Sequence, residues 1–305
     1  MSPELPSSSV YVAAVTPHRQ DDYESDVGRM LELVDFLAAA GVDGIALLGS
    51  TGEFLHFSLA DRVRLVQLAV KRSRVPILVG VGHSTLSGAV SLAQEALRAG
   101  AHAVLALPPY FFRYGQEEIR EFYRQFAVAV GVPERIFLYN VPFFTNPIAV
   151  ETAKELLSSG QCGGIKDSSG DFTYFEELLA LSRKKSFCLL IGNDRIYTRA
   201  RRAGAHGVVS GIACCVPELL VALERAIRNN TESEIVRLDG ILQEFIGWHD
   251  RFPTPVAIKT AMELRGLSTG PLATPLSPET GKLLQEFSEW FNAWFSEVQK
   301  ETAHV

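Results

Sequence analysis

The chain has 305 residues, of which 47% are hydrophobic and 21% are charged, and its formal net charge at pH 7 is −6. A chain of this length and composition buries a substantial core. Lysine and arginine are scattered along it rather than gathered in a stripe, which argues against a nucleic-acid partner. No apolar run approaches the ~20 residues of a membrane span, and the first residues do not resemble a signal peptide. We therefore expect no membrane partner and a cytoplasmic location.

Short apolar runs alternate with segments of helical periodicity along most of the chain. The first run, 10–15, stops at Thr16-Pro17, and apolar side chains then recur at helical spacing over 27–40. The same strand–helix unit repeats, giving eight units. The later strands are predicted at 44–48, 76–80, 103–107, 135–139, 163–166, 187–191 and 207–209, and their helices at 58–71, 84–99, 116–130, 149–157, 172–182, 195–203 and 217–228.

This alternation predicts an α/β fold with a parallel sheet, because parallel neighbours need a crossover connection. Eight units with short strands within 1–229 favour a closed (β/α)₈ TIM barrel over an open sheet. The dinucleotide-binding pattern G-x-G-x-x-G does not follow the first strand, and no P-loop is present. Residues 230–305 are predicted to form a C-terminal helical region, with helices at 232–248, 255–265 and 278–300.

Lys166 marks the point where the sixth predicted strand becomes polar. The active site of a TIM barrel lies at the carboxyl ends of its strands. A lysine placed there can form an imine with a carbonyl substrate if it is desolvated enough to lose its proton. Alternatively, its stem lies along the buried strand and its ammonium group reaches water. This stretch alone leaves both interpretations open.

Two other strand ends carry polar side chains. The sequence G-S-T-G-E at 49–53 places Ser50 and Thr51 side by side, between glycines that let backbone N–H groups turn inward. This pattern suits a carboxylate-binding turn, although such turns are also frequent before helices. Tyr139 ends the strand that would neighbour the Lys166 strand at about 4.8 Å. Its phenol can both donate and accept a proton, or it can lie in the rim of the core.

Taken together, these motifs resemble those of the dihydrodipicolinate synthase/N-acetylneuraminate lyase family. G-S-T-G-E at 49–53, Y-N-V-P at 139–142 and G-I-K-D-S at 164–168 match its three signatures in order and spacing, and the similarity extends to P-T-P-V-A-I-K-T-A at 253–261. The resemblance implies a Schiff-base-forming lyase of the class I aldolase type. Such an enzyme makes or breaks a carbon–carbon bond using pyruvate or a related 2-oxo acid.

The resemblance also implies roles for individual residues. Lys166 would form the imine, Tyr139 would transfer protons, and Ser50 would support that transfer. The remaining substrate-binding positions would be Gly49, Thr51 and Val209. No metal or organic cofactor is implied, because the protonated imine itself withdraws electrons. The family further implies a homotetramer built as a dimer of dimers.

Two positions depart from the synthase pattern. Phe144 stands where the synthase has an arginine that receives the carboxylate of its aldehyde substrate. Phe111 stands where the family has the second of two adjacent tyrosines, which reaches across a dimer to complete a proton relay. Tyr110 is offset by one residue and is interpreted as a rim contact or as a substitute for that tyrosine.

These departures argue against a true dihydrodipicolinate synthase and favour an apolar or hydroxylated second partner, with Phe144 in the pocket wall. Three alternatives stay open. The first is a sugar-acid dehydratase of the 2-keto-3-deoxy type that uses the same lysine. The second is dihydrodipicolinate synthase itself, and the third is a non-catalytic barrel that binds a 2-oxo acid.

Overall fold

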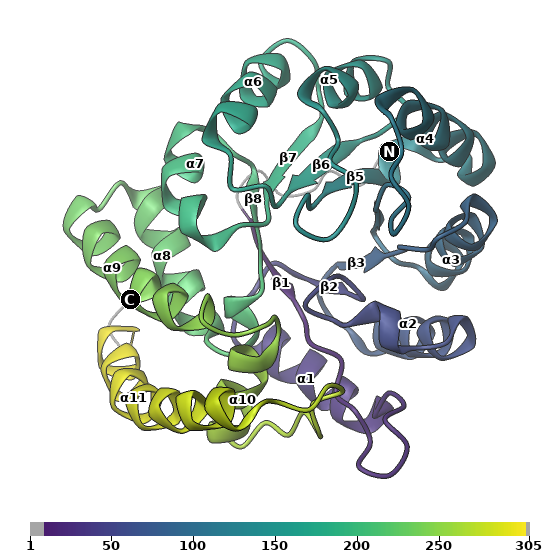
Figure 1. Ribbon diagram of the computed structural model, residues 1–305. Coiled ribbons are helices and arrows are strands. Elements are labelled where there is room, and N and C mark those ends of the chain that lie inside the picture. The colour runs from purple at the N-terminus through teal and green to yellow at the C-terminus, as the bar shows by residue number, and fades with distance from the viewer. Residues whose placement is uncertain (1–8, 303–305) are drawn as a thin grey trace.

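A computed structural model describes residues 9–302, and within them eight parallel strands close into a barrel (Figure 1). The strands follow chain order, and β1 pairs with β8 to complete the circle. Their bounds are β1 Ser9–Ala13, β2 Gly44–Leu47, β3 Ile77–Gly80, β4 Ala103–Ala106, β5 Ile136–Asn140, β6 Gly164–Asp167, β7 Cys188–Ile191 and β8 Gly207–Ser210. The predicted (β/α)₈ barrel is confirmed.

Each strand is followed by a helix on the outside of the barrel (Figure 1). The helices are α1 Val27–Ala39, α2 Leu59–Arg72, α3 Leu86–Ala99, α4 Gln116–Val130, α5 Val150–Ser158, α6 Phe172–Ser182, α7 Tyr197–Ala203 and α8 Pro217–Asn229. Short 3₁₀ helices lie in the connections, at Phe54–His56, Pro133–Arg135, Asp194–Ile196 and Ile212–Cys214. None of the helices within residues 9–302 is both long and apolar enough to cross a membrane.

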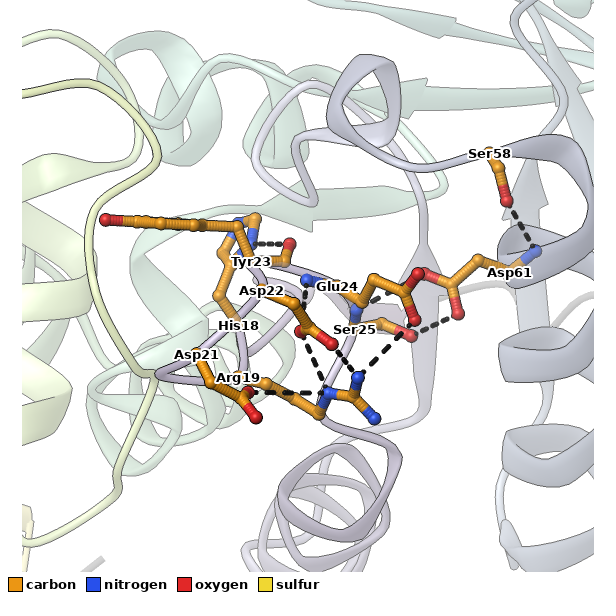
Figure 2. Close-up of polar contacts among 9 residues, drawn as sticks. All are labelled: His18, Arg19, Asp21, Asp22, Tyr23, Glu24, Ser25, Ser58 and Asp61. Atoms are coloured by element: carbon orange, nitrogen blue, oxygen red, sulfur yellow. Dashed lines mark hydrogen bonds and ion pairs between the residues drawn. The ribbon is translucent and has the colours of Figure 1, made fainter.

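Local sequence signals fix several helix ends. The Ser58 side chain accepts a hydrogen bond from the Asp61 backbone N–H at the start of α2 (Figure 2), as expected for an N-cap serine. Asp26 caps α1 in the same way. Gly100 ends α3 with φ +103°, a left-handed conformation that glycine adopts without steric cost.

β5 and β6 each extend one residue beyond the predicted strand, so Lys166 is the penultimate residue of β6 rather than the last. Their register pairs Tyr139 with Lys166 and Asn140 with Asp167. The Asn140 side-chain amide donates a hydrogen bond to Asp167 Oδ1 at 2.8 Å. The same two residues thus form both the last register pair of β5 and β6 and a buried side-chain hydrogen bond between these strands.

Three further helices follow α8, namely α9 Glu232–His249, α10 Val256–Leu264 and α11 Pro278–Thr302. An aromatic cluster joins α9 and α11, in which Phe245 lies 5.9 Å from Phe287 and 5.3 Å from Trp294 between ring centroids. The segment before α10 reaches the mouth of the barrel, because Pro253 and Thr254 line the same cavity as Lys166. The division of the chain into 1–229 and 230–305 stays a prediction.

Candidate active site

Lys166 and Tyr139 lie side by side at the carboxyl ends of β6 and β5. They are register partners, and the Lys166 Nζ atom lies 4.2 Å from the centroid of the Tyr139 ring. Both side chains are buried, with 3% and 1% exposure. In the described part of the chain Lys166 has no ion-pair partner. A buried amine beside a phenol, with no carboxylate in direct contact, suits imine chemistry.

Ser50 extends this pair into a chain of three groups. Its Oγ atom lies 3.0 Å from the Tyr139 hydroxyl, and either atom can be the donor. Burial opposes ionisation of Tyr139, but the charge of Lys166 and the hydrogen bonds from Ser50 and Lys166 outweigh it and lower the pKa of the phenol. A phenol with a lowered pKa is better suited to accept and return protons near neutral pH.

The turn that carries Ser50 and Thr51 has an unusual backbone. Leu48 and Glu53 flank it with φ values of +55° and +50°, which non-glycine residues seldom adopt. Gly52 packs so closely that an added Cβ would lie 2.9 Å from the Leu48 backbone nitrogen. The Thr16 hydroxyl donates to the Gly52 carbonyl at 2.8 Å. These contacts hold the strained turn in one conformation.

Glu53 anchors the far end of this turn in a buried polar cluster. Lys259 of α10 forms an ion pair with Glu53, and the Nε2 atom of His18 lies 3.6 Å from the same carboxylate. The Nδ1 atom of His18 lies 2.8 Å from the Tyr23 carbonyl, and Ser25 donates to Asp61 at 2.7 Å (Figure 2). The β1–α1 loop, the β2–α2 turn and α10 are thereby joined beside the candidate site.

The space for Lys166 depends on Gly192, the residue after β7. A Cβ at Gly192 would lie 2.6 Å from Lys166 Cε and 2.1 Å from Ser168 Oγ. Real Cβ atoms do not approach so closely, so any side chain here would displace the lysine. Asp194 lies nearby, and burial raises the pKa of its carboxyl despite opposing interactions with Ser210 and His249.

A cavity of about 760 Å³ opens above Lys166 and brings together most of the predicted site residues. Besides Lys166, the predicted residues that line it are Ser50, Thr51, Tyr139, Phe144 and Val209. Polar groups of the β7–α7 connection, among them Asn193 and Asp194, line its other side. We call this space the Lys166 cavity. Its size is typical of small-molecule sites.

The other candidate residues lie elsewhere around this cavity. Gly49 is buried but is not among the residues that line the cavity, and a Cβ there would meet no atom within 4 Å. Tyr110 lines an adjoining cavity instead, with its ring edge-on to Phe54 at 6.0 Å. Phe111 is 88% exposed in the β4–α4 loop. The roles predicted for Gly49 and Tyr110 stay predictions.

No role was predicted for Lys259 or Glu53, although they lie within the motifs at 253–261 and 49–53, and Gly192 was not expected to contact Lys166. Gly192 follows an apolar strand and precedes Asn193, a pattern of small and polar residues that indicated only a ligand-facing loop. No local pattern marked the pairing of Glu53 with Lys259. Those two residues meet only because α10 returns to the mouth of the barrel.

One group of described side chains has the donor set of a metal site. The candidate donor atoms of His18, Glu53 and His56 lie within 4.8 Å of one another. However, the ammonium group of Lys259 already contacts Glu53, and its positive charge opposes a cation at the same carboxylate. The expectation that no metal is required stays a prediction.

The fold and the site describe a TIM barrel with a buried lysine at the carboxyl end of its sixth strand. The sequence matches the model of the dihydrodipicolinate synthetase family over residues 6–293, and the chain belongs to this family. It is therefore a lyase of the class I aldolase type, in a family whose members use pyruvate.

Curated relatives and solved structures agree with this assignment. The chain is 33% identical over 293 residues to a 4-hydroxy-tetrahydrodipicolinate synthase of Chlorobium limicola, covering 94% of this chain and 97% of that protein. It is 30% identical over 270 residues to the corresponding synthase of Methanothrix thermoacetophila, covering 88% and 90%.

Among solved structures, the 4-hydroxy-tetrahydrodipicolinate synthase of Methylacidiphilum fumariolicum SolV superposes with a TM-score of 0.87 at 27% identity, covering 96% of this chain and 98% of that one. The N-acetylneuraminate lyase of Mycoplasma synoviae shares the fold, with a TM-score of 0.81 at 22% identity over 93% and 96% of the two chains.

Proposed function

We propose that this chain joins pyruvate, or a related 2-oxo acid, reversibly to an aldehyde through an imine on Lys166. The observation that carries the proposal is the buried Lys166 amine at the cavity floor, beside the Tyr139 hydroxyl and the Ser50 hydroxyl. Thr51 and the backbone of its turn supply hydrogen-bond donors for the substrate carboxylate. Val209 lines the same cavity and serves as an apolar contact near the imine.

The reaction follows from this arrangement. The Lys166 amine attacks the keto carbon of pyruvate, and loss of water leaves a protonated imine. Tyr139 transfers the protons of these steps, and Ser50 positions its hydroxyl. Loss of a proton from the pyruvate methyl group gives an enamine, whose carbon bonds to the aldehyde carbon while the aldehyde oxygen gains a proton. Water then hydrolyses the imine and releases a 4-hydroxy-2-oxo acid and the free lysine.

Phe144 indicates the chemistry of the second partner. It is 62% exposed at the mouth of the barrel and lines the Lys166 cavity. An aromatic ring cannot pair with a carboxylate as a guanidinium does. We therefore propose an aldehyde partner without a carboxylate near this position.

Two other activities have specific support. The curated relatives described above are named 4-hydroxy-tetrahydrodipicolinate synthase, which favours that synthase as a second candidate. The polar groups of Asn193 and Asp194 in the Lys166 cavity suit hydroxyl groups, and they favour a sugar-acid dehydratase acting through the same lysine. Release of pyruvate from a 4-hydroxy-2-oxo acid distinguishes carbon–carbon cleavage from dehydration.

Trapping the imine tests the proposal directly. The native protein incubated with pyruvate and borohydride should gain the mass of one reduced pyruvate adduct, and Lys166→Ala should not gain it. Lys185→Ala, which removes an exposed lysine, is the matched control and should keep the adduct. An adduct that persists in Lys166→Ala would contradict the assignment of this lysine.

The homotetramer and the cytoplasmic location stay predictions that the resemblance and the sequence support. Sedimentation of the purified protein measures the first. A monomer at micromolar concentration would contradict the tetramer.

A further inference from the structure

A second cavity, of about 530 Å³, adjoins the Lys166 cavity. We call it the apolar wing and define it by six of its lining residues, which are Phe54, Leu107, Tyr110, Val256, Leu272 and Leu276. The two cavities share six wall residues, which are Ser50, Tyr139, Val141, Phe144, Pro253 and Thr254. The wing therefore begins at the hydroxyl groups proposed to transfer protons.

The lining of the apolar wing has little to offer a charged ligand. Phe54, Leu107 and Val256 are buried and present apolar surface. None of the described residues that line it is a lysine or an arginine, and its one carboxylate, Glu53, is paired with Lys259. Its one imidazole, His56, lies 3.5 Å from the same carboxylate. A carboxylate placed here would lose its hydration without gaining a lysine or arginine partner, which is unfavourable. An apolar group would gain from the burial of its surface.

Phe144 lies at the boundary between the two cavities. A ligand that reacts at the Lys166 imine and extends past Tyr139 and Phe144 enters the wing without crossing a charged side chain. Because Ser50 and Tyr139 belong to both linings, the wing adjoins the reacting atoms and is not an isolated packing defect. An apolar space beside the reacting atoms is the usual form of a specificity pocket.

We propose that the apolar wing binds the apolar substituent of the aldehyde that reacts with the Lys166-bound 2-oxo acid. This inference rests on the proposed function. The 2-oxo acid occupies the Lys166 cavity, and the aldehyde carbonyl lies where Ser50 and Tyr139 border both cavities. The hydrocarbon tail of the aldehyde extends over Phe54 and Leu276. The substrate class is thus an aliphatic or aromatic aldehyde, and the product is a 4-hydroxy-2-oxo acid with an apolar tail.

A chain-length series tests this inference on the native protein. The kcat/KM for addition of pyruvate is measured with propanal, butanal, pentanal and hexanal, and with glyceraldehyde and succinic semialdehyde for comparison. Each buried methylene should raise kcat/KM about fourfold. Hexanal should exceed both polar aldehydes. A flat or falling series, or a preference for glyceraldehyde or succinic semialdehyde, would overturn the inference.

Two variants test whether the dependence of kcat/KM on chain length arises in the apolar wing. Leu276 lines the wing and is partly buried, and Leu276→Gln should weaken the gain in kcat/KM per methylene. Leu68, which is 37% exposed and lines neither cavity, gives the control Leu68→Gln, which should keep the native series. An unchanged series in Leu276→Gln would place the hydrocarbon tail elsewhere and contradict the inference.

The borohydride adduct at Lys166, measured on the same samples, distinguishes failure of the apolar wing from failure of the imine mechanism. An adduct together with a flat aldehyde series overturns the wing and leaves the imine mechanism standing. The absence of an adduct with pyruvate and with larger 2-oxo acids overturns the proposed function and the wing with it.

Discussion

Lys166 and Lys259 are both buried lysines near the carboxyl ends of the strands, yet their surroundings differ completely. Lys259 is 1% exposed and forms an ion pair with Glu53. Lys166 is 3% exposed, faces a large cavity and lies beside the Tyr139 ring. The buried carboxylate of Asp194 interacts with it electrostatically but forms no ion pair with it. Burying a lysine costs free energy in either case. The difference is whether a carboxylate in direct contact offsets that cost.

The comparison separates a lysine that holds the structure from one available for chemistry. Desolvation lowers the pKa of Lys259, although the charge of Glu53 opposes that effect. Its amine is occupied by the carboxylate and lines neither the Lys166 cavity nor the apolar wing. The Lys166 amine is open to a substrate. Exchanging each lysine for a neutral side chain of similar length should therefore affect different properties.

The largest effect is expected for Lys166→Met. Loss of the nucleophile should reduce kcat for the aldehyde reaction by at least about 10⁴-fold, the scale seen when a covalent nucleophile is removed. The free energy of unfolding should not fall, because no ion pair is broken. Activity assays and urea titration measure the two properties. A variant that loses stability while keeping activity would reverse the assignment of the two lysines.

Lys259→Met should show the opposite pattern. It leaves the Glu53 carboxylate buried without its ammonium partner, and breaking a buried ion pair in this way typically costs about 3–5 kcal/mol of unfolding free energy. Any activity loss should follow from loosening of the turn that carries Ser50, and the Lys166 adduct with pyruvate should still form. Urea unfolding against the exposed control Lys185→Met provides the measurement. Equal stability of the two variants would contradict a structural role for Lys259.

This contrast also shows what the sequence could predict. The barrel followed from eight alternations of apolar runs and helical periodicity, and the adjacency of Tyr139 and Lys166 followed from the order of parallel strands. Lys166 stood out because it interrupts an apolar strand and is followed by polar residues, although its role in forming the imine came from the family resemblance. These are local signals, which a chain displays before it folds.

The pairing of Lys259 with Glu53 had no such signal. Lys259 lies in a helical segment and Glu53 in a turn far earlier in the chain, and only the return of α10 to the barrel mouth brings them together. The contact of Gly192 with Lys166 likewise depends on barrel closure. The extra register pair of Asn140 and Asp167 depends on a side-chain hydrogen bond between two strands. Contacts that arise from tertiary packing leave no periodic pattern in one sequence.

A smaller effect on activity is expected for a change at Ser50, which lies in the site around Lys166. The hydrogen bond from Ser50 is one of the causes that lower the pKa of Tyr139. Ser50→Ala should therefore raise that pKa and move the basic limb of the pH–rate profile to higher pH. Tyrosinate absorbance, taken as the difference between each protein and its Tyr139→Phe counterpart, measures the pKa directly. A downward shift would contradict a contribution of the Ser50 hydrogen bond to the lowered pKa of Tyr139.

The smallest effect concerns the acid stability conferred by Glu53. Burial alone would raise the pKa of this carboxyl, but His18 and Lys259 outweigh it, so the folded-state pKa lies below the ordinary value of 4.5. A carboxyl with a lowered folded-state pKa contributes stability that is present above the unfolded pKa and is lost as pH falls through the folded pKa. The unfolded chain then binds more protons, and stability falls with decreasing pH by at most about 1.4 kcal/mol per pH unit for one group.

The double variant Glu53→Gln/Lys259→Met removes this proton linkage together with the ion pair. Its unfolding free energy at pH 7 should be close to that of the native protein, because replacing both partners of a buried ion pair is often neutral. Carboxyl groups titrate between about pH 5 and pH 3. Over this interval the unfolding free energy of the double variant should fall less steeply than that of the native protein. Glu244→Gln, at an exposed position, should keep the native slope. Parallel slopes for the native protein and the double variant would show that Glu53 titrates alike in the folded and unfolded chains, and the two buried lysines would then differ in their access to substrate rather than in charge compensation.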